Sequence, residues 1–364
     1  MDERLYCLAF SNAPNIGAGR FADLLKKFKT AQMAWSSTEE EFKLDGIGEK
    51  IFLDFDRFRK KFDFEKYQTN LTQKNIWFVA LCDKDYPKSF KKLENPPIVI
   101  YGKGDKSCLK TPQTLGVVGT RKVTSYGKDV TESLVAQLTN FGFTVVSGMA
   151  LGVDAIAHIS CLDHKGKTIA VLGNGVDLPF PRENQSLYQK ILEKRGVVIS
   201  EYPPGANPTK GSFPARNRLI AALSLGVLIP EAATGSGSLI TAEYAKKLGK
   251  PIFAVPGPIT SRMSDGTSQL LQDGAVLVRS AQDIVKVLNI SSKSSQTKSK
   301  RDFSKLPLSK NELKVCKSLE NENLSIDDIF QKTKIEIRKL SIILSEMEMK
   351  GIVLREDGRV ILAM

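Results

Sequence analysis

Seven short apolar runs, separated by segments of helical spacing, dominate the middle of this 364-residue chain. They are residues 115–118, 143–146, 168–172, 197–199, 227–229, 252–255 and 275–278. Strands that are apolar almost throughout, without a polar residue at every second position, are typical of a sheet covered on both faces. The first intervening segment carries Val130, Leu134 and Leu138 at helical spacing, which predicts a helix that buries one stripe. The alternation therefore predicts the α/β class, with a doubly wound, mostly parallel Rossmann-like sheet.

The pattern changes on both sides of this repeat. Residues 1–70 have helical spacing and two glycine-containing turns, at 15–19 and 44–48, and predict a helical domain of the SAM or helix-hairpin-helix kind. Such turns can hold a DNA phosphate, but an ordinary helical turn or a protein-docking module has the same signature. Strand candidates at 77–81 and 98–101 precede the repeat, so the extended Rossmann-like domain is predicted over residues 71–290.

The C-terminal part divides into a linker and a small domain. Residues 291–305 are rich in serine and basic residues, with Asp302 as the single acid, and predict a linker. Residues 306–364 have the pattern of three short helices followed by a two-stranded hairpin, which is the order of a winged-helix domain. Domains of this kind contact either DNA or protein, so the pattern predicts the fold and leaves the role open.

The charge balance indicates an anionic partner. The chain has 53 basic and 40 acidic residues, for a formal net charge of +13. Nucleic acid is the commonest partner of such a chain, and a membrane surface or an acidic protein is the alternative. A lysine-rich composition with solvated helix faces is also consistent with the charge.

Several cellular and chemical settings are disfavoured by the composition. The five cysteines are scattered and form no CxxC pair, and only two histidines are present, which argues against a disulfide framework and against any metal site. No stretch approaches the roughly 18 apolar residues of a membrane span, and no signal peptide is recognisable. We therefore expect a cytoplasmic protein without a membrane span.

Glycine, serine and basic residues gather in the loops that follow the predicted strands. These loops are residues 119–121, 147–154, 173–177, 202–218, 231–241 and 256–258. In a doubly wound sheet, ligands bind outside the carboxyl ends of the strands, so the loops meet at the edge where a site is expected. Glycine allows a backbone to approach an anion closely, and helix N-termini offer free N–H groups to it. The predicted backbone contacts to phosphate are Gly119, Ser236, Gly237 and Ser238.

Side chains in the same loops supply charge and one ring. The candidate DNA-binding cations are Arg121, Lys210, Arg216 and Arg218, and Phe213 offers a face on which a base could stack. For Arg216 and Arg218, internal ion pairs are an equally good explanation. The alternative for Phe213 is a position in the hydrophobic core.

Known enzymatic motifs do not fit these loops. A dinucleotide site requires an acid near the end of the second strand, where residues 145–148 read VVSG. A P-loop requires GxxxxGK[ST], and residues 205–212 read GANPTKGS. His158 has the setting of a half-buried structural histidine. Four carboxylates fit acid–base chemistry and helix capping equally well: Asp154, Asp177, Glu201 and Glu231. We therefore predict no catalytic residue, no cofactor and no enzymatic activity.

Taken together, the strings resemble the DNA-processing protein A (Smf) family over at least residues 77–288. They are GVVGTR at 116–121 with YG at 126–127, VVSG at 145–148, GVD at 152–154 with AH at 157–158, TIAVLG at 168–173, FPARNR at 213–218, SGSLITA at 236–242 and AVPG at 254–257. The resemblance implies a protein that binds and protects incoming single-stranded DNA, forms a homodimer and loads the RecA recombinase in natural transformation or recombination. It also implies that the nine residues named above contact the DNA.

Two positions depart from the family pattern, and one enzymatic alternative stays open. Leu151 stands where the family usually has arginine, and Phe180 stands where it often has tyrosine. The loss of the arginine removes a candidate phosphate contact or a structural ion pair. The alternative is a Rossmann-like nucleotide-binding hydrolase of the nucleoside-monophosphate phosphoribohydrolase type, although its characteristic glycine-rich loop is not found here.

Overall fold

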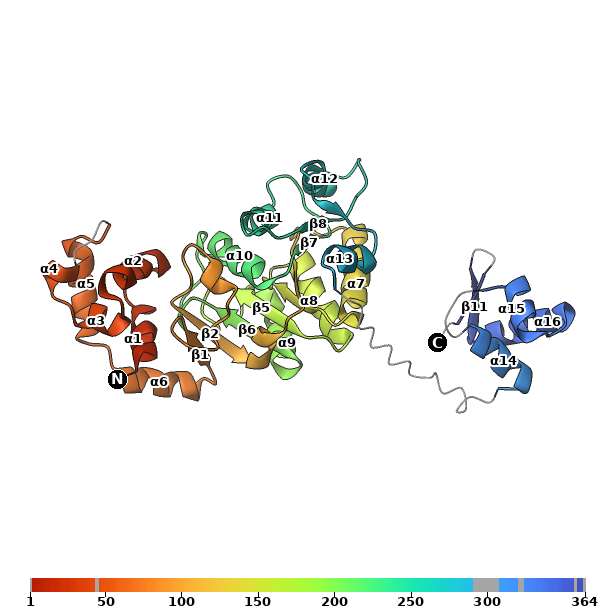
Figure 1. The fold of residues 1–364 in the computed structure, drawn as a ribbon, viewed down its shortest axis with the longest axis horizontal. Coiled ribbons are helices and arrows are strands. Elements are labelled where there is room, and N and C mark those ends of the chain that lie inside the picture. Colours follow the sequence, from red (N-terminus) through yellow and green to blue (C-terminus); the bar gives the residue numbers. More distant parts are fainter. Residues whose placement is uncertain (1, 43–45, 291–307, 320–323, 357–358, 363–364) are drawn as a thin grey trace. The chain divides into compact units, whose positions relative to one another are not determined.

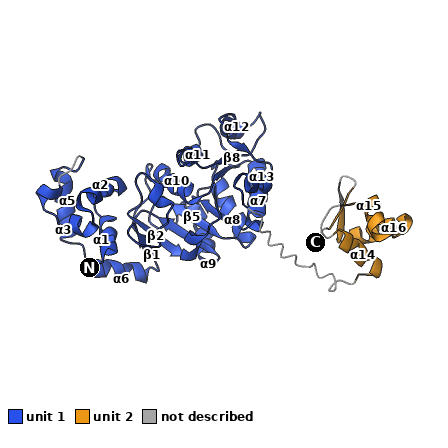
Figure 2. Ribbon diagram, in the orientation of Figure 1, with its two compact units in different colours: residues 1–292 blue, residues 293–364 orange. Residues whose placement is uncertain are grey.

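The structure is a computed structural model that describes the whole chain except residues 1, 43–45, 291–307, 320–323, 357–358 and 363–364. The chain divides into two compact units, residues 1–292 and residues 293–364 (Figure 2). The linker predicted over residues 291–305 lies outside the described residues. Within the described ranges, no helix combines the length and the apolar character that a membrane span requires.

A nine-stranded sheet forms the centre of the first unit (Figure 1). Its spatial order is β1-β2-β6-β5-β4-β3-β7-β8-β9. Strands β3 to β9 run parallel, β2 pairs antiparallel with β6, and β1 pairs antiparallel with β2. The strands are β1 (Trp77–Ala80), β2 (Val99–Gly104), β3 (Thr114–Val117), β4 (Thr144–Ser147), β5 (Thr168–Leu172), β6 (Gly196–Ser200), β7 (Val227–Ile229), β8 (Ile252–Ala254) and β9 (Val276–Leu277). The predicted doubly wound, mostly parallel sheet is confirmed.

Helices cover both faces of this sheet because successive side chains of each strand point to opposite sides. On β4, for example, Val146 packs in the cluster that contains α10 and α11, and Val145 packs in the cluster that contains α7, α8 and α13. The helices are α7 (Ser125–Asn140), α8 (Val153–Asp163), α9 (Gln185–Glu193), α10 (Ser212–Leu223), α11 (Gly237–Lys247), α12 (Asp265–Gln272) and α13 (Ala281–Val287). Short 3-10 helices are η1 (Phe90–Lys92), η2 (Lys106–Lys110), η3 (Arg182–Asn184) and η4 (Arg262–Ser264).

Six helices at the N-terminus pack around a core rich in aromatic rings. They are α1 (Glu3–Phe10), α2 (Ala18–Phe28), α3 (Ala31–Ser36), α4 (Glu39–Phe42), α5 (Glu49–Arg59) and α6 (Phe64–Gln73). The core continues into the sheet through Tyr101 of β2, whose hydroxyl lies 2.6 Å from Ser11 Oγ and accepts a hydrogen bond from Asn12. The helical region and the edge of the sheet therefore share one hydrophobic core.

Arg20 of α2 connects the two glycine-containing turns of this region. Arg20 donates from Nε to the Gly46 carbonyl and from Nη1 to the Asn15 carbonyl, at 3.1 and 2.7 Å. Residues 44 and 45 of the second predicted turn lie outside the described residues. Each turn leads directly into a helix, α2 or α5, so both turns have a structural role in joining helices.

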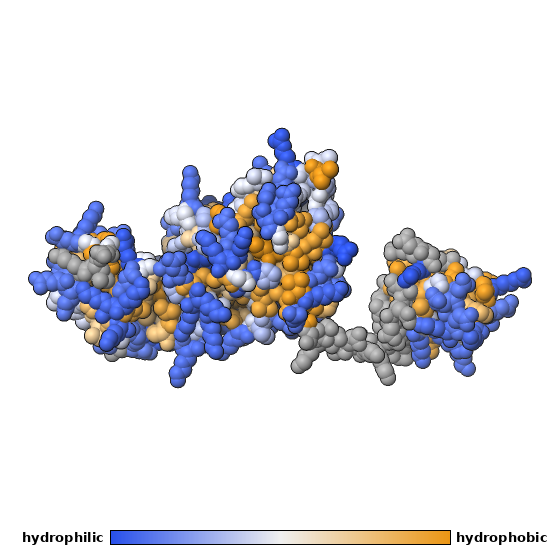
Figure 3. Space-filling model, turned by 45° about the horizontal axis from the view of Figure 1, so that its top comes forward, coloured by the Kyte–Doolittle hydropathy of each residue, from blue (hydrophilic) through white to orange (hydrophobic). Residues whose placement is uncertain are grey.

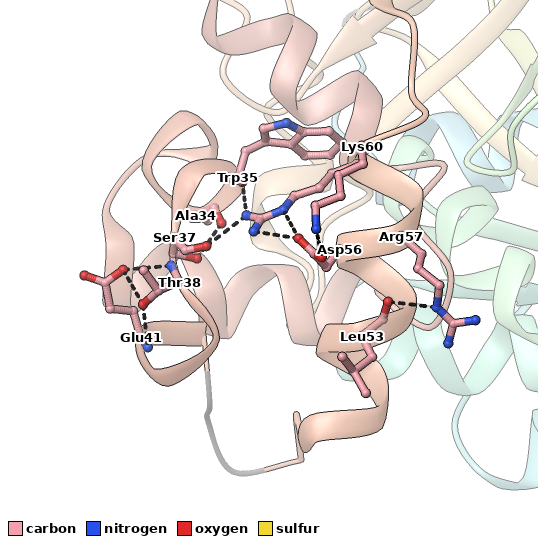
Figure 4. A network of polar contacts seen from close by, with 10 residues as sticks. Ala34, Trp35, Ser37, Thr38, Glu41, Leu53, Asp56, Arg57 and Lys60 are labelled. Carbon is pink, nitrogen blue, oxygen red and sulfur yellow. Dashed lines mark hydrogen bonds and ion pairs between the residues drawn. The ribbon is translucent and has the colours of Figure 1, made fainter.

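Arg59 at the end of α5 bonds to the C-terminal end of α3 and to the residue that follows it. Its guanidinium donates to the carbonyls of Trp35 and Ser37, at 2.6 and 2.9 Å, and pairs with Asp56. Figure 4 shows Trp35, Ser37 and Asp56 around this network, with Lys60 reaching the same Asp56 carboxylate. A cation that satisfies two carbonyls and a carboxylate stabilises the orientation of these helices.

The second unit has its own small core and a three-stranded sheet of order β10-β12-β11. Its elements are α14 (Lys310–Ser318), β10 (Leu324–Ser325), α15 (Ile326–Thr333), α16 (Ile337–Met349), β11 (Val353–Glu356) and β12 (Arg359–Leu362). The predicted winged-helix fold is confirmed. The two-residue strand β10, which the sequence pattern does not predict, adds a third strand to the hairpin.

Candidate nucleic-acid interface

A cleft of about 590 Å³ opens at the carboxyl edge of the sheet. It lies where the strand order reverses, because β3 is followed on one side by β4 and on the other by β7. In open α/β sheets this reversal is the usual position of a ligand site. The predicted site residues that line the cleft are Gly119, Arg121, Lys210, Phe213, Arg216, Ser236, Gly237 and Ser238. Arg218 does not line it.

The N-terminus of α11 forms one wall of the cleft. Ser236 caps the helix by accepting a hydrogen bond from the Ser238 N–H, and the two hydroxyls lie 2.8 Å apart. Asn217 of α10 donates to the Gly237 carbonyl at 3.1 Å and so holds this turn in place. The positive end of the helix dipole and the free N–H groups of the first turn favour an anion here.

Thr241 is a polar residue of this wall that the sequence analysis missed. It lines the cleft one turn beyond Ser238, and its Oγ1 is buried without a hydrogen-bond partner among the described residues. The spacing of three residues from Ser238 on a helix is the signal that could have identified it.

Gly119 allows the loops after β3 and β7 to lie against each other. A Cβ at this position would be 2.6 Å from a methyl carbon of Val153 and 2.7 Å from the Glu231 carbonyl oxygen. The neighbouring Thr120 N–H donates to that same carbonyl at 2.9 Å. Any larger residue at position 119 would force these two loops apart, and both of them line the cleft.

Lys122 is an exposed cation of the cleft that the sequence analysis missed. The two predicted cations, Arg121 and Lys210, are exposed as well. Neither pairs with a carboxylate in the part of the chain that the structure describes. The loop that carries Lys210 is held by reciprocal hydrogen bonds between Thr209 and Ser212, at 3.1 and 3.2 Å. The two positive charges are therefore available to an anionic ligand from fixed positions.

Arg216 lies beneath the cleft and bonds internally. Only 5% of its surface is exposed, and its guanidinium donates to the carbonyls of Gly148, at 2.7 Å, and Val171. Burial lowers the pKa of Arg216 to about 10, so the side chain stays charged at neutral pH, and nearby Asp154 favours that charge. Burial raises the pKa of the Asp154 carboxyl, and Arg216 opposes this rise.

Arg218, which does not line the cleft, forms a largely buried ion pair with Glu201. Burial raises the pKa of Glu201, and Arg218 works in the opposite direction. The structure therefore brings Arg121, Lys210 and Phe213 together at the surface of the cleft, and it assigns Arg216 and Arg218 to internal contacts.

Phe213 is half-buried and belongs to an aromatic pair that the sequence analysis did not predict. Its ring stacks on that of Phe180, with centroids 5.5 Å apart and an angle of 28° between the planes. The guanidinium carbon of Arg121 lies 5.9 Å from the centre of the Phe213 ring. The signal that could have identified Phe180 is its position in the loop after β5, at the same edge of the sheet. Leu151, where the family usually has arginine, is exposed in the loop before α8.

The carboxylates that were considered for acid–base chemistry are all engaged. The Glu231 carboxylate accepts from the Thr124 N–H at 2.9 Å, and that of Asp154 accepts from the Gly148 N–H at 3.0 Å. Asp177 pairs with Lys74, and Glu201 pairs with Arg218.

His158 was expected to be half-buried and is fully buried. Its Nδ1 lies 2.6 Å from Thr168 Oγ1, and burial lowers its pKa to about 3. The imidazole is therefore neutral at physiological pH and packs inside the protein, outside the lining of the cleft.

Comparisons with known proteins match both units. A family profile described as DNA recombination-mediator protein A matches residues 77–289, and one described as DprA winged helix domain matches residues 299–359. Protein Smf from Synechocystis sp. is 31% identical over an alignment of 389 positions, which covers 98% of this chain and 98% of that protein.

Two solved structures are also similar. DNA processing protein A from Streptococcus pneumoniae is 32% identical with a TM-score of 0.67, over 79% of this chain and 98% of that chain. DNA processing protein A from Helicobacter pylori, whose structure concerns its single-stranded DNA binding mode, is 37% identical with a TM-score of 0.53, over 59% and 97%. The resemblance indicated by the motifs is confirmed: this chain belongs to the DNA recombination-mediator protein A family.

Proposed function

We propose that this protein binds single-stranded DNA in the cleft between the loops after β3 and β7. The observation that carries the proposal is the arrangement of Arg121 and Lys210, two exposed cations without carboxylate partners, around the half-exposed ring of Phe213. Phosphates would contact the cations and the N-terminus of α11, and an unpaired base would stack on the aromatic ring. In duplex DNA the bases are already stacked on one another, which favours single strands as the ligand.

The proposed role in the cell is supported by the resemblance to the family. The protein protects incoming single-stranded DNA and loads the RecA recombinase on it in natural transformation or recombination. The rate of RecA filament formation on single-stranded DNA, measured with and without this protein, tests the loading step. An unchanged rate contradicts it.

The protein forms a homodimer in this proposal. Apolar residues reach the surface of the first unit (Figure 3). Leu277 on β9, an edge strand of the sheet, is 48% exposed. Exposed apolar side chains beside an open strand edge favour association. Light scattering should give twice the mass of one chain, and Leu277→Glu should lower it.

The protein acts as a DNA-binding protein without catalysis, in the cytoplasm. The carboxylates near the cleft are engaged in hydrogen bonds or ion pairs, which supports binding over acid–base chemistry. All five cysteines are free thiols, as is usual in the reducing cytosol. Incubation with nucleoside monophosphates distinguishes the hydrolase alternative, because that enzyme would release free base.

The direct test of DNA binding is fluorescence anisotropy of a labelled oligo-dT titrated with the full chain. The proposal predicts a saturable rise that an excess of unlabelled oligo-dT reverses. No change in anisotropy at micromolar protein contradicts it.

A further inference from the structure

Phe180 is a large aromatic side chain that remains 37% exposed beside the cleft. One face of its ring stacks on Phe213, at a centroid distance of 5.5 Å. Phe213 is the more buried of the two rings, and a Cβ at position 173 would lie 3.3 Å from its Cδ1. Phe180 therefore offers more free ring surface than Phe213 does.

The loop that carries Phe180 is anchored on both sides of the ring. Before it, Asn174 donates to the carbonyls of Leu178 and Gly175, at 2.6 and 3.0 Å. After it, Asn184 is buried and donates to the Met149 carbonyl at 2.9 Å. An aromatic ring in a loop fixed in this way loses little conformational freedom when a ligand stacks on it.

The charges around the pair suit a nucleic-acid strand. Arg121 lies next to Phe213, and Arg182, which is exposed, follows Phe180 by two residues. One cation therefore lies near the Phe213 ring in space, and another follows Phe180 closely in the chain. Rings together with cations are the combination that holds base and phosphate of a single strand.

We infer that Phe180 is the outer ring of a two-ring base platform, on which a base stacks while Phe213 supports the ring from behind. The inference rests on the proposed function, since it needs a single strand in the cleft. The inference also gives the path of the strand across the protein. The path runs from the N-terminus of α11 past Arg121 and Phe213, over Phe180 and toward Arg182.

The test is a set of substitutions at position 180 in the full chain, measured with oligo-dT. Phe180→Ala should weaken binding by roughly 5- to 150-fold, the range for loss of one stacked base. Phe180→Tyr and Phe180→Trp should keep most of the affinity, and Phe180→Leu, which is apolar but has no ring, should not. The salt dependence should stay as in the wild type because no charge is removed.

Tryptophan at position 180 gives a direct signal. In Phe180→Trp, the fluorescence of the new residue should be quenched as oligo-dT binds, because a base stacks on it. If the fluorescence of Trp at this position does not change at saturating DNA, or if the Phe180→Leu variant binds like the wild type, the inference is wrong. Leu225→Ala, at a residue of similar exposure next to the start of β7, is the control that should bind normally.

Separate variants test the two-ring platform and DNA binding in the cleft. If the wild type binds oligo-dT and Arg121→Ala weakens that binding, the proposed function stands whatever position 180 does. If Phe180→Ala then binds like the wild type, only the platform is wrong. A double substitution completes the test. In a Phe213→Ala background, the loss of DNA affinity caused by Phe180→Ala should be smaller than in the wild type, because the two rings form one stack.

Discussion

Arg216 and Gly148 are joined beneath the cleft in a contact that only glycine permits. The Arg216 guanidinium donates to the Gly148 carbonyl at 2.7 Å, and a Cβ on residue 148 would lie 2.5 Å from a guanidinium nitrogen. The Gly148 N–H donates in turn to Asp154 at 3.0 Å. A buried cation, a glycine backbone and a buried carboxylate therefore connect α10 to the loop after β4.

Arg216→Ala should destabilise the fold. The change leaves the Asp154 carboxyl and two carbonyls without their buried partner, which typically costs about 3–5 kcal/mol of unfolding free energy. Urea unfolding of the variant and the wild type measures the difference. Lys210→Ala, at an exposed position, is the control that should unfold like the wild type. An Arg216→Ala protein of normal stability but weak DNA binding contradicts the structural role.

Arg121→Ala and Lys210→Ala should weaken DNA binding without changing stability. Each removes an exposed cation from the cleft, so the slope of log affinity against log salt should fall by roughly 0.7 per substitution. Anisotropy titrations at several salt concentrations measure both quantities. Lys247→Ala, at the opposite end of α11 from the cleft, should change neither the affinity at a given salt nor the slope. A melting temperature clearly below that of the wild type assigns the residue a structural role instead.

Phe213→Ala should reduce the affinity for oligo-dT by roughly 5- to 150-fold, because the stack with Phe180 and a base is lost. Phe213→Tyr and Phe213→Trp should retain most of the affinity, and the salt slope should not change. The measurement pairs oligonucleotide affinity with melting temperature for each variant. If Phe213 is instead a core residue, Phe213→Ala should lose about 3–5 kcal/mol of unfolding free energy at unchanged affinity. That result excludes a stacking role.

His158 should make the protein less stable in acid. Burial, with a smaller contribution from Arg216, lowers its pKa to about 3 in the folded state, against about 6.5 in the unfolded chain. Between these values the unfolded state binds the proton and the folded state does not. Stability should therefore fall as pH decreases from about 6.5 toward 3, by up to about 1.4 kcal/mol per pH unit.

The His158→Gln variant isolates this contribution. Urea unfolding from pH 7 to pH 4 should show a shallower loss of stability for the variant than for the wild type. The same slope in both proteins means that the imidazole does not determine the acid sensitivity.

The sheet could be predicted because buried parallel strands leave a strong local signal. The seven apolar runs correspond to β3 through β9, and the loops that follow them meet at one edge because the strands are parallel. This geometry also explains why residues as far apart as Gly119 and Ser238 line one cleft. Strand β10 consists of one apolar residue, Leu324, and one polar residue, Ser325, so it leaves no apolar run of the kind that marks the other strands.

The contacts between loops could not be predicted in the same way. Phe180 and Phe213 lie in different loops, and nothing local to either position indicates that the rings stack. Arg216 follows Phe213 by three residues and both residues line the cleft, yet Phe213 is half-buried and Arg216 is buried against Gly148. Which side of α10 faces the sheet depends on packing with the loop after β4, and the sequence of α10 does not contain that information.

Preference for single strands is the property that separates a cleft that binds phosphates and stacked bases from a general anion site. It is measured by titrating the full chain with oligo-dT and with a duplex of equal length, each at several salt concentrations. We expect tighter binding of the single strand at every salt concentration, with log affinity falling by about 0.7 per neutralised phosphate for each unit of log salt. Equal or tighter binding of the duplex, or an affinity for oligo-dT that salt does not change, contradicts it.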